Sequence, residues 1–169
     1  MKEIFNRRSI RKFLDRPVEK DKIDLLLKAA MQAPSAGNQQ PWEFIVVENK
    51  EALEKLGHMT PYSKPAAESA VTFVLIANCK ELRHNTFWPQ DLSAAMQNIL
   101  LEAVQLELGA VWMGVATNKA AEDYLIDMFH FPEYIKPFAL VALGYPDGQK
   151  NEFTDRYKPE KVHYEKWNG

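Results

Sequence analysis

Four cations stand within six positions near the N-terminus, in the stretch RRSIRKF at residues 7–13. Arg7, Arg8, Arg11 and Lys12 repel one another, although the chain as a whole has a formal net charge of −2. Such a cluster is stabilised either by an anionic ligand or by full exposure to water on a solvated surface. The chain contains neither G-x-G-x-x-G nor G-x-x-x-x-G-K-[ST], the motifs whose backbone amides hold phosphates. If the protein binds a phosphorylated ligand, side-chain cations must hold the phosphate, and the arginine guanidinium suits that task.

A second candidate region is the loop APSAGNQQPWEF at residues 33–44. Two prolines restrict its backbone, and between them stand neutral hydroxyl and amide groups: Ser35, Asn38, Gln39 and Gln40. These side chains offer both donors and acceptors, as the edge of a planar heteroaromatic ring with alternating carbonyls and ring nitrogens requires. The alternative is a capping loop, in which the same residue types satisfy helix and turn backbone.

Other features exclude several classes of protein. The four histidines lack the spacing of metal ligands, so we expect no metal site. No G-x-S-x-G motif supports a hydrolase triad. The acidic net charge, and the absence of aromatic residues within the basic cluster, argue against a nucleic-acid partner. The N-terminus does not resemble a signal peptide and no apolar stretch reaches transmembrane length, so we expect a cytoplasmic protein with no membrane partner.

The elements that must position these groups alternate between helix and strand. Apolar residues at helical spacing, and the placement of proline and glycine, predict helices at residues 18–34, 50–57, 89–109 and 120–128. Runs rich in β-branched residues predict buried strands at 43–49, 71–78, 110–115 and 138–145. With no internal repeat and no linker, this order indicates one α+β domain over residues 1–169.

Two features predict contact with a second subunit. The helix at 89–109 is apolar nearly all round, and a partner subunit is a simple way to bury such a helix in a small protein. The polar, proline-interrupted segment 147–169 retains aromatic residues that a free disordered tail rarely carries. We therefore expect it to form an extended arm that packs on the partner.

Four stretches in sequence order resemble the FMN-dependent nitroreductase family. Its members open with R-[RH]-S-x-[RK]-x-F and continue with P-S-x-x-N-x-Q-P-W, which here read RRSIRKF and PSAGNQQPW. The likeness extends through QDLSAAMQNILLEAVQLELGAVWMGV, similar to the family's central helix and following strand, and ends in DRYKPEKVHYEKW. The resemblance covers nearly the whole chain. It implies a nitroreductase-like α+β fold, with a central, mostly antiparallel four-stranded sheet flanked by helices.

The resemblance also implies how FMN is held. Arg7, Arg8 and Ser9 would lie near its phosphate and ribityl chain, and Arg11 near the pyrimidine edge of the ring. The remaining implied contacts come from the polar loop, in its own or the partner subunit, from the strand beside the ring, and from a basic pair in the arm: Pro34, Ser35, Ala36, Asn38, Gln40, Trp112, Met113, Gly114, Arg156 and Lys158. No catalytic side chain and no metal are implied, because the protein's part is to bind and orient the cofactor.

The implied function is that of a homodimeric oxidoreductase with FMN sites at the subunit interface. NAD(P)H would deliver hydride to flavin N5, and a small electron-poor acceptor such as a nitroaromatic or quinone would then take it in a ping-pong cycle. Other flavin chemistry on the same scaffold, such as dehalogenation or dehydrogenation, and a non-catalytic flavin-binding role are alternatives. Ala36 stands where the family often has a second hydroxyl, and the chain lacks a long insertion over the pocket, so the acceptor stays open. Tyr62, Phe87 and Trp88 are candidate pocket walls, with core or interface packing as the alternative.

Overall fold

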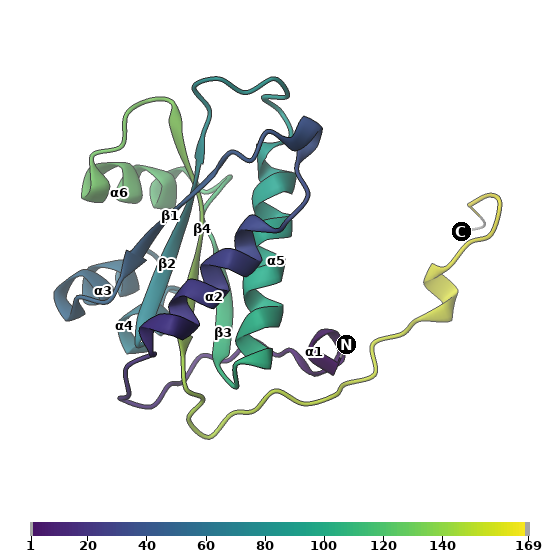
Figure 1. Ribbon diagram of the computed structural model, residues 1–169, viewed down its shortest axis with the longest axis horizontal. Helices are drawn as coiled ribbons and strands as arrows, with labels where there is room; N and C mark the ends of the chain where they lie inside the picture. The colour runs from purple at the N-terminus through teal and green to yellow at the C-terminus, as the bar shows by residue number, and fades with distance from the viewer. Residues whose placement is uncertain (1, 168–169) are drawn as a thin grey trace.

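The computed structural model describes residues 2–167, in which helices cover both faces of a four-stranded sheet (Figure 1). The strands are β1 (Trp42–Val47), β2 (Val71–Asn78), β3 (Gly109–Gly114) and β4 (Ile135–Gly144). Their order across the sheet is β1-β2-β4-β3, and every neighbouring pair is antiparallel. The predicted α+β fold with an antiparallel sheet is confirmed.

Two helix layers bury the central strands. On one face lie α2 (Lys20–Met31) and α5 (Trp88–Gln105), and on the other lie α3 (Lys50–Gly57), α4 (Lys64–Glu68) and α6 (Lys119–Phe129) (Figure 1). Successive side chains of β2 alternate between the two layers, with Phe73 packed among residues of the first and Val74 among residues of the second. Both faces of β2 are covered, which explains why its sequence is a continuous apolar run.

The structure corrects the end of the long helix. The sequence pattern predicts a helix up to Gly109, but α5 ends at Gln105 and Glu107 adopts a left-handed backbone with φ of 62°. Gly109 is the first residue of β3, so it does not terminate the helix. Two helices of five residues, α1 (Lys2–Asn6) and α4, were not predicted because a single turn is too short to display helical periodicity. No helix within residues 2–167 is long and apolar enough to cross a membrane.

The segment after β4 is an extended arm, as the sequence predicts up to residue 167; residues 168 and 169 of the predicted arm lie outside the described residues. Figure 1 shows it leaving the body of the protein, passing α1 and ending away from the sheet beyond a short 3-10 turn, η2 (Pro159–Lys161). The rings of Phe5 and Phe153 approach to 6.4 Å. Large apolar side chains along the arm are between 62% and 78% exposed: Phe153, Tyr157, Tyr164 and Trp167. This chain alone therefore leaves the arm's aromatic surface uncovered.

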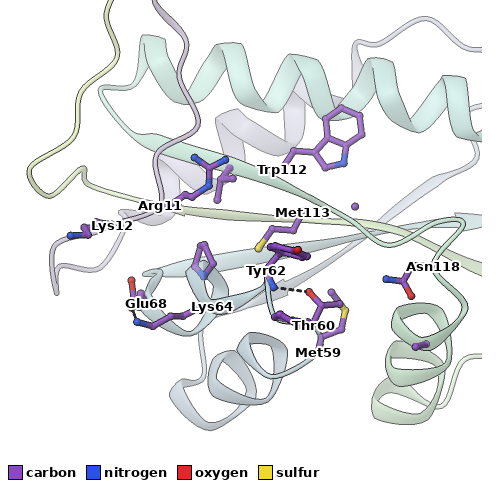
Figure 2. Close-up of a pocket in the computed structure, with 15 residues that line it drawn as sticks. Arg11, Lys12, Met59, Thr60, Tyr62, Lys64, Glu68, Trp112, Met113 and Asn118 are labelled. Carbon is purple, nitrogen blue, oxygen red and sulfur yellow. Dashed lines mark hydrogen bonds and ion pairs between the residues drawn. The ribbon is translucent and has the colours of Figure 1, made fainter.

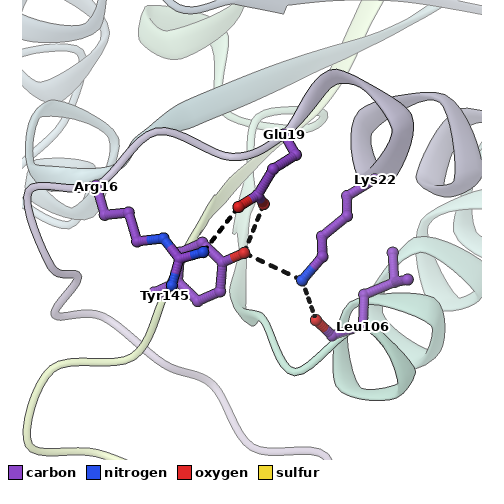
Figure 3. A network of polar contacts seen from close by, with 5 residues as sticks. All are labelled: Arg16, Glu19, Lys22, Leu106 and Tyr145. Carbon is purple, nitrogen blue, oxygen red and sulfur yellow. Dashed lines mark hydrogen bonds and ion pairs between the residues drawn. The ribbon is translucent and has the colours of Figure 1, made fainter.

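A polar network ties the N-terminal segment to the ends of β4 and α5 (Figure 3). Glu19, which precedes α2, accepts hydrogen bonds from Arg16 at 2.7 Å and from the Tyr145 hydroxyl at 2.5 Å. Lys22 donates to the same hydroxyl at 3.0 Å and to the Leu106 carbonyl at 2.9 Å. The hydrogen bond from Tyr145 is the largest cause that lowers the pKa of Glu19 from 4.5 to about 2. The folded protein therefore favours ionised Glu19.

This pKa shift predicts how a Glu19→Gln variant depends on pH. A lowered folded-state pKa contributes stability that is fully present above 4.5 and is lost as the pH falls through about 2. We expect the Tm of Glu19→Gln to lie below that of wild type near neutral pH, and the difference to narrow across this range. Thermal unfolding over a pH series measures it. Ile23→Val, a change at a buried residue of α2 that has no titratable group, is the control and should lower Tm equally across the series. A Tm difference for Glu19→Gln that stays constant would contradict the assignment.

Candidate functional site

The basic segment lies as extended chain along the edge strand β3. Ser9 forms a parallel bridge with Ala110, and the Ile10 N–H donates to the Ala110 carbonyl at 3.0 Å. The Ile10 side chain is only 1% exposed. A Cβ on Gly109 would lie 2.5 Å from Ile10 Cγ2, so the close approach of the two segments requires glycine at that position. The sheet edge thus fixes the backbone from which the cations project.

Two amide side chains at the start of the arm hold the same segment from its other side. Asn151 accepts the Arg8 N–H at 3.0 Å and donates to the Leu108 carbonyl at 3.0 Å. Gln149 Oε1 accepts the backbone N–H of Arg11 at 2.7 Å and that of Lys12 at 3.1 Å. These bonds use the backbone of the basic segment. None of them uses the guanidinium groups of Arg8 and Arg11 or the ammonium group of Lys12.

Three arginines gather around a small cavity of about 260 Å³. Arg7, Arg8 and Arg156 line it together with Asp155, the one carboxylate in that lining within the described part of the chain. Burial is the main cause that lowers the pKa of Arg7, followed by the charges of Arg156 and Arg8. The single carboxylate in this described lining therefore does not balance the charge of the three guanidinium groups.

The Arg8 side chain shows most directly where an anion is missing. Its Nη1 donates to the carbonyls of Arg7 at 2.6 Å and Phe5 at 3.3 Å. Its Nη2 is buried and, among the described residues, has no hydrogen-bond partner. Burial of a charged donor without an acceptor costs free energy, on the order of 1–3 kcal/mol or more. A phosphate fits this cluster, because its oxygens would satisfy Nη2 and its charge would offset the three guanidinium groups.

A larger cavity of about 740 Å³ opens beside β3 (Figure 2). Figure 2 shows Arg11 and Lys12 toward one end, Asn118 toward the other, and Met113 and Tyr62 between them. The lining is mainly apolar with charged residues from the basic segment and α4: Arg11, Lys12, Met59, Thr60, Pro61, Tyr62, Lys64, Pro65, Glu68, Val111, Trp112, Met113, Gly114, Asn118 and Ala120. Volumes of this order are typical of sites for small molecules and cofactors. Four predicted residues meet here, Arg11 and the three of β3.

The three aromatic residues suggested as pocket walls lie in different surroundings. Tyr62 lines the cavity and is 86% exposed, on a turn fixed by the buried Ser63 hydroxyl, which accepts the Thr60 N–H at 2.8 Å. Phe87 instead packs on the ring of His84, and Trp88 packs on Phe138 with ring centroids 6.1 Å apart. Trp88 thus packs on the core, whereas Phe87 is 48% exposed, and neither lines the larger cavity in the described part of the chain.

The polar loop lies away from both cavities. Residues 34–40, with the 3-10 turn η1 (Ala36–Asn38), pack against the first turn of α5, where the Ala36 N–H donates to Asp91 at 2.8 Å. None of residues 33–44 lines either cavity in the described part of the chain. The side chains of Asn38 and Gln40 point to solvent from left-handed backbone, with φ of 56° and 47°. Lys158, at the start of η2, also lines neither cavity, whereas Arg156 joins Arg7 and Arg8.

Comparisons with known proteins identify the family of this chain. The sequence model of the nitroreductase family matches residues 4–61 and 58–145. This chain belongs to the nitroreductase family. The match includes the basic segment, the polar loop and β3, whereas Arg156 and Lys158 lie beyond its end.

Relatives resemble this chain over nearly its full length. A protein of Archaeoglobus fulgidus, provisionally named an NADH dehydrogenase/NAD(P)H nitroreductase, is 41% identical over 170 residues, 99% of this chain and 98% of its own. The crystal structure of a Clostridium acetobutylicum protein, provisionally named an NADH oxidase, has a TM-score of 0.96 at 45% identity, covering 98% of this chain and 99% of that one. A protein of Desulfovibrio desulfuricans, provisionally named a nitroreductase and solved in complex with FMN, has a TM-score of 0.86 at 30% identity, covering 99% and 96%.

Sequence reasoning missed several residues of the candidate site. Gln149 and Asn151 hold the basic segment, but an isolated amide in a polar stretch carries no signal that separates it from a surface residue. Lys64 and Asn118 line the larger cavity from two helix starts distant in sequence, and only the fold brings them beside β3.

The contact between Gly109 and Ile10 predicts a strong effect of a single methyl group. Gly109→Ala places a Cβ against the buried Ile10, so either the basic segment shifts or the sheet edge strains, and we expect a loss of about 1–3 kcal/mol in unfolding free energy. Gly114→Ala, at the other end of β3, meets nothing within 4 Å and should change the free energy by less than about 0.5 kcal/mol. Denaturant unfolding measures both. Equal effects of the two substitutions would contradict the close approach.

Proposed function

We propose that residues 1–169 form one FMN-binding domain, and that this protein is a cytoplasmic, NAD(P)H-dependent oxidoreductase. Its acceptor is a small electron-poor molecule such as a nitroaromatic or a quinone. One observation carries the proposal: the buried Arg8 Nη2 has no partner within the described residues, inside a cluster of three arginines. The basic segment continues from that cluster along β3 to Arg11, at the mouth of a largely apolar cavity. An anion-binding cluster joined to an apolar cavity suits a ligand with a phosphate at one end and a flat ring at the other.

Different residues of the candidate site would bind different parts of FMN. Arg7, Arg8 and Arg156 would hold the phosphate, with Ser9 beside the ribityl chain. Arg11 would place its positive charge at the pyrimidine edge, where it favours the negative charge of the reduced ring. Trp112, Met113 and Gly114 would pass along the other edge, where the exposed backbone of Gly114 has room for close approach. When bound, FMN supplies the two-electron chemistry, taking hydride from NAD(P)H and giving it to the acceptor.

The protein contributes binding, orientation and a water-poor surface. Met59, Pro61, Tyr62 and Met113 would form apolar walls against which a flat substrate can lie in contact with the cofactor. Hydride transfer between two stacked rings requires alignment and no side-chain nucleophile. We therefore assign no catalytic residue.

We further propose that the protein is a homodimer with its FMN sites at the interface. Within one chain, residues 34–40 line neither the cationic cavity nor the cavity beside β3, and a second copy would bring the loop and the cationic cluster to one FMN. Leu101 and Val104 of α5 are only half-buried, and the arm leaves its aromatic residues exposed. Burial of these surfaces against the partner would stabilise the dimer and order Lys158 near the cofactor.

Absorption spectroscopy tests the oxidoreductase directly. Purified protein supplied with FMN is expected to show bound flavin absorption, and anaerobic addition of NADH or NADPH is expected to bleach it, with colour restored by a nitroaromatic or quinone. Bound flavin that neither nucleotide bleaches would keep the cofactor and reject the reaction. Protein that takes up no FMN would reject the proposed function.

Complementation between variants tests the shared site. Arg8→Ala damages the cationic part and Asn38→Ala the polar loop, and each homodimer should bind FMN at least about tenfold more weakly than wild type. If the parts come from different subunits, a purified heterodimer of the two variants contains one undamaged site and should bind about one FMN per dimer with wild-type affinity. A heterodimer of Arg8→Ala with Arg11→Ala is the matched control and should have no undamaged site. Weak binding by both heterodimers would place the whole site within one chain.

A further inference from the structure

A buried carboxylate at the first turn of α5 contacts the polar loop with both of its oxygens. Asp91 is 4% exposed. Its Oδ1 accepts the Ala36 N–H at 2.8 Å, and its Oδ2 accepts the Gln39 side-chain amide at 2.6 Å. Hydrogen bonds to an ionised acceptor are stronger than those between neutral groups, and these two join α5 to the loop.

The orientation of the Gln39 amide is fixed independently. Its Oε1 accepts the His84 N–H at 3.1 Å, and its Nε2 donates to the His84 carbonyl at 3.2 Å. Rotation of the amide by half a turn would set Nε2 against an N–H and Oε1 against a carbonyl. Gln39 therefore presents a donor to Asp91, as the Ala36 backbone does. Only a group with two acceptors and no donor satisfies both.

The loop needs such a hold because its backbone is strained. Gly37, Asn38 and Gln40 all have left-handed φ values, of 55°, 56° and 47°. Side chains other than glycine adopt this region at a cost, which persists only where the surroundings impose it. Within the loop, the Ser35 hydroxyl accepts the Gln40 N–H at 3.0 Å. The exposed Asn38 and Gln40 side chains face outward and leave Asp91 to hold the loop from beneath.

We propose that Asp91 is a positioning residue, which holds residues 35–40 in the conformation that presents their hydroxyl and amide groups to FMN. The inference rests on the proposed function for the identity of the ligand. Asp91 itself is beneath the loop and does not touch the cofactor.

Asp91→Asn tests the proposal with almost no change in shape. In either orientation of the new amide, its NH₂ group faces a donor, Ala36 N–H or Gln39 Nε2, so one contact becomes repulsive. We expect the FMN dissociation constant to rise about tenfold or more, and backbone amides of residues 35–40 in the FMN-free protein to exchange with solvent faster. FMN titration and hydrogen exchange measure the two effects.

Ile99→Val is the matched control. Ile99 is a buried core residue of the same helix and has no polar side-chain group. The loss of one methyl group should lower Tm without removing a hydrogen bond to the loop. Its FMN affinity and its exchange in residues 35–40 should equal those of wild type. A merely structural role for Asp91 predicts the same pattern for Asp91→Asn, and that result would overturn the proposal.

Gln39→Ala provides a second route if Asp91→Asn does not fold. Removal of the amide takes away one of the two donors, and we expect a smaller rise in exchange than Asp91→Asn causes. In the double variant, the introduced asparagine can turn its oxygen to the Ala36 N–H without repulsion from Gln39, so the two substitutions should be markedly non-additive. Additive effects, or wild-type exchange in Gln39→Ala, would contradict the network.

The failure of this inference and that of the proposed function give different results. Wild-type protein that takes up no FMN rejects the function, and the exchange rates of residues 35–40 then decide the role of Asp91 alone. Wild-type protein that binds FMN, with Asp91→Asn equal to it in affinity and exchange, keeps the function and rejects the inference.

Discussion

The backbone contact between Ile10 and β3 fixes the position of the basic segment and therefore of its arginines. The Ile10 N–H bonds to Ala110, its side chain is buried, and Gly109 leaves room for that approach. From this anchored point, the arginines on one side reach the small cavity shared with the arm. Arg11 on the other side reaches the larger cavity beside β3. A shift of this segment would separate the two, so the geometry of the proposed phosphate and ring sites depends on one glycine.

Formation of the cationic cluster costs free energy, and an anionic ligand would offset that cost. Burial and two neighbouring charges lower the pKa of Arg7, and Arg8 keeps a buried donor without a partner within the described residues. Proteins normally satisfy such groups, and departures from this rule concentrate at functional sites. The backbone bonds from Gln149 and Asn151 hold the segment in place against this repulsion. The Arg8 Nη2 group is thus held in place where an anion could accept its hydrogen bond.

The polar loop is a second segment that side chains from elsewhere in the chain hold in position. Its backbone is strained, its Asn38 and Gln40 side chains are exposed, and the buried Asp91 holds it from beneath. The two preorganised parts are separate within a single chain. In the proposed homodimer, two copies would together complete the site, and cofactor binding would then depend on association.

The sequence by itself determined the strands and longer helices of the fold and the chemistry of the two candidate binding segments. The strand at 71–78 was predicted to the residue, because both its faces are buried and its apolar run has sharp ends. The basic cluster and the amide loop were visible because charge and hydrogen-bonding capacity are properties of residue types. Tertiary structure alone decided that Gly109 serves contact with Ile10 and does not end a helix, and that Gln149, Asn151 and Asp91 are supports. These roles depend on which distant groups a side chain meets in space, and no local pattern of residue types specifies that.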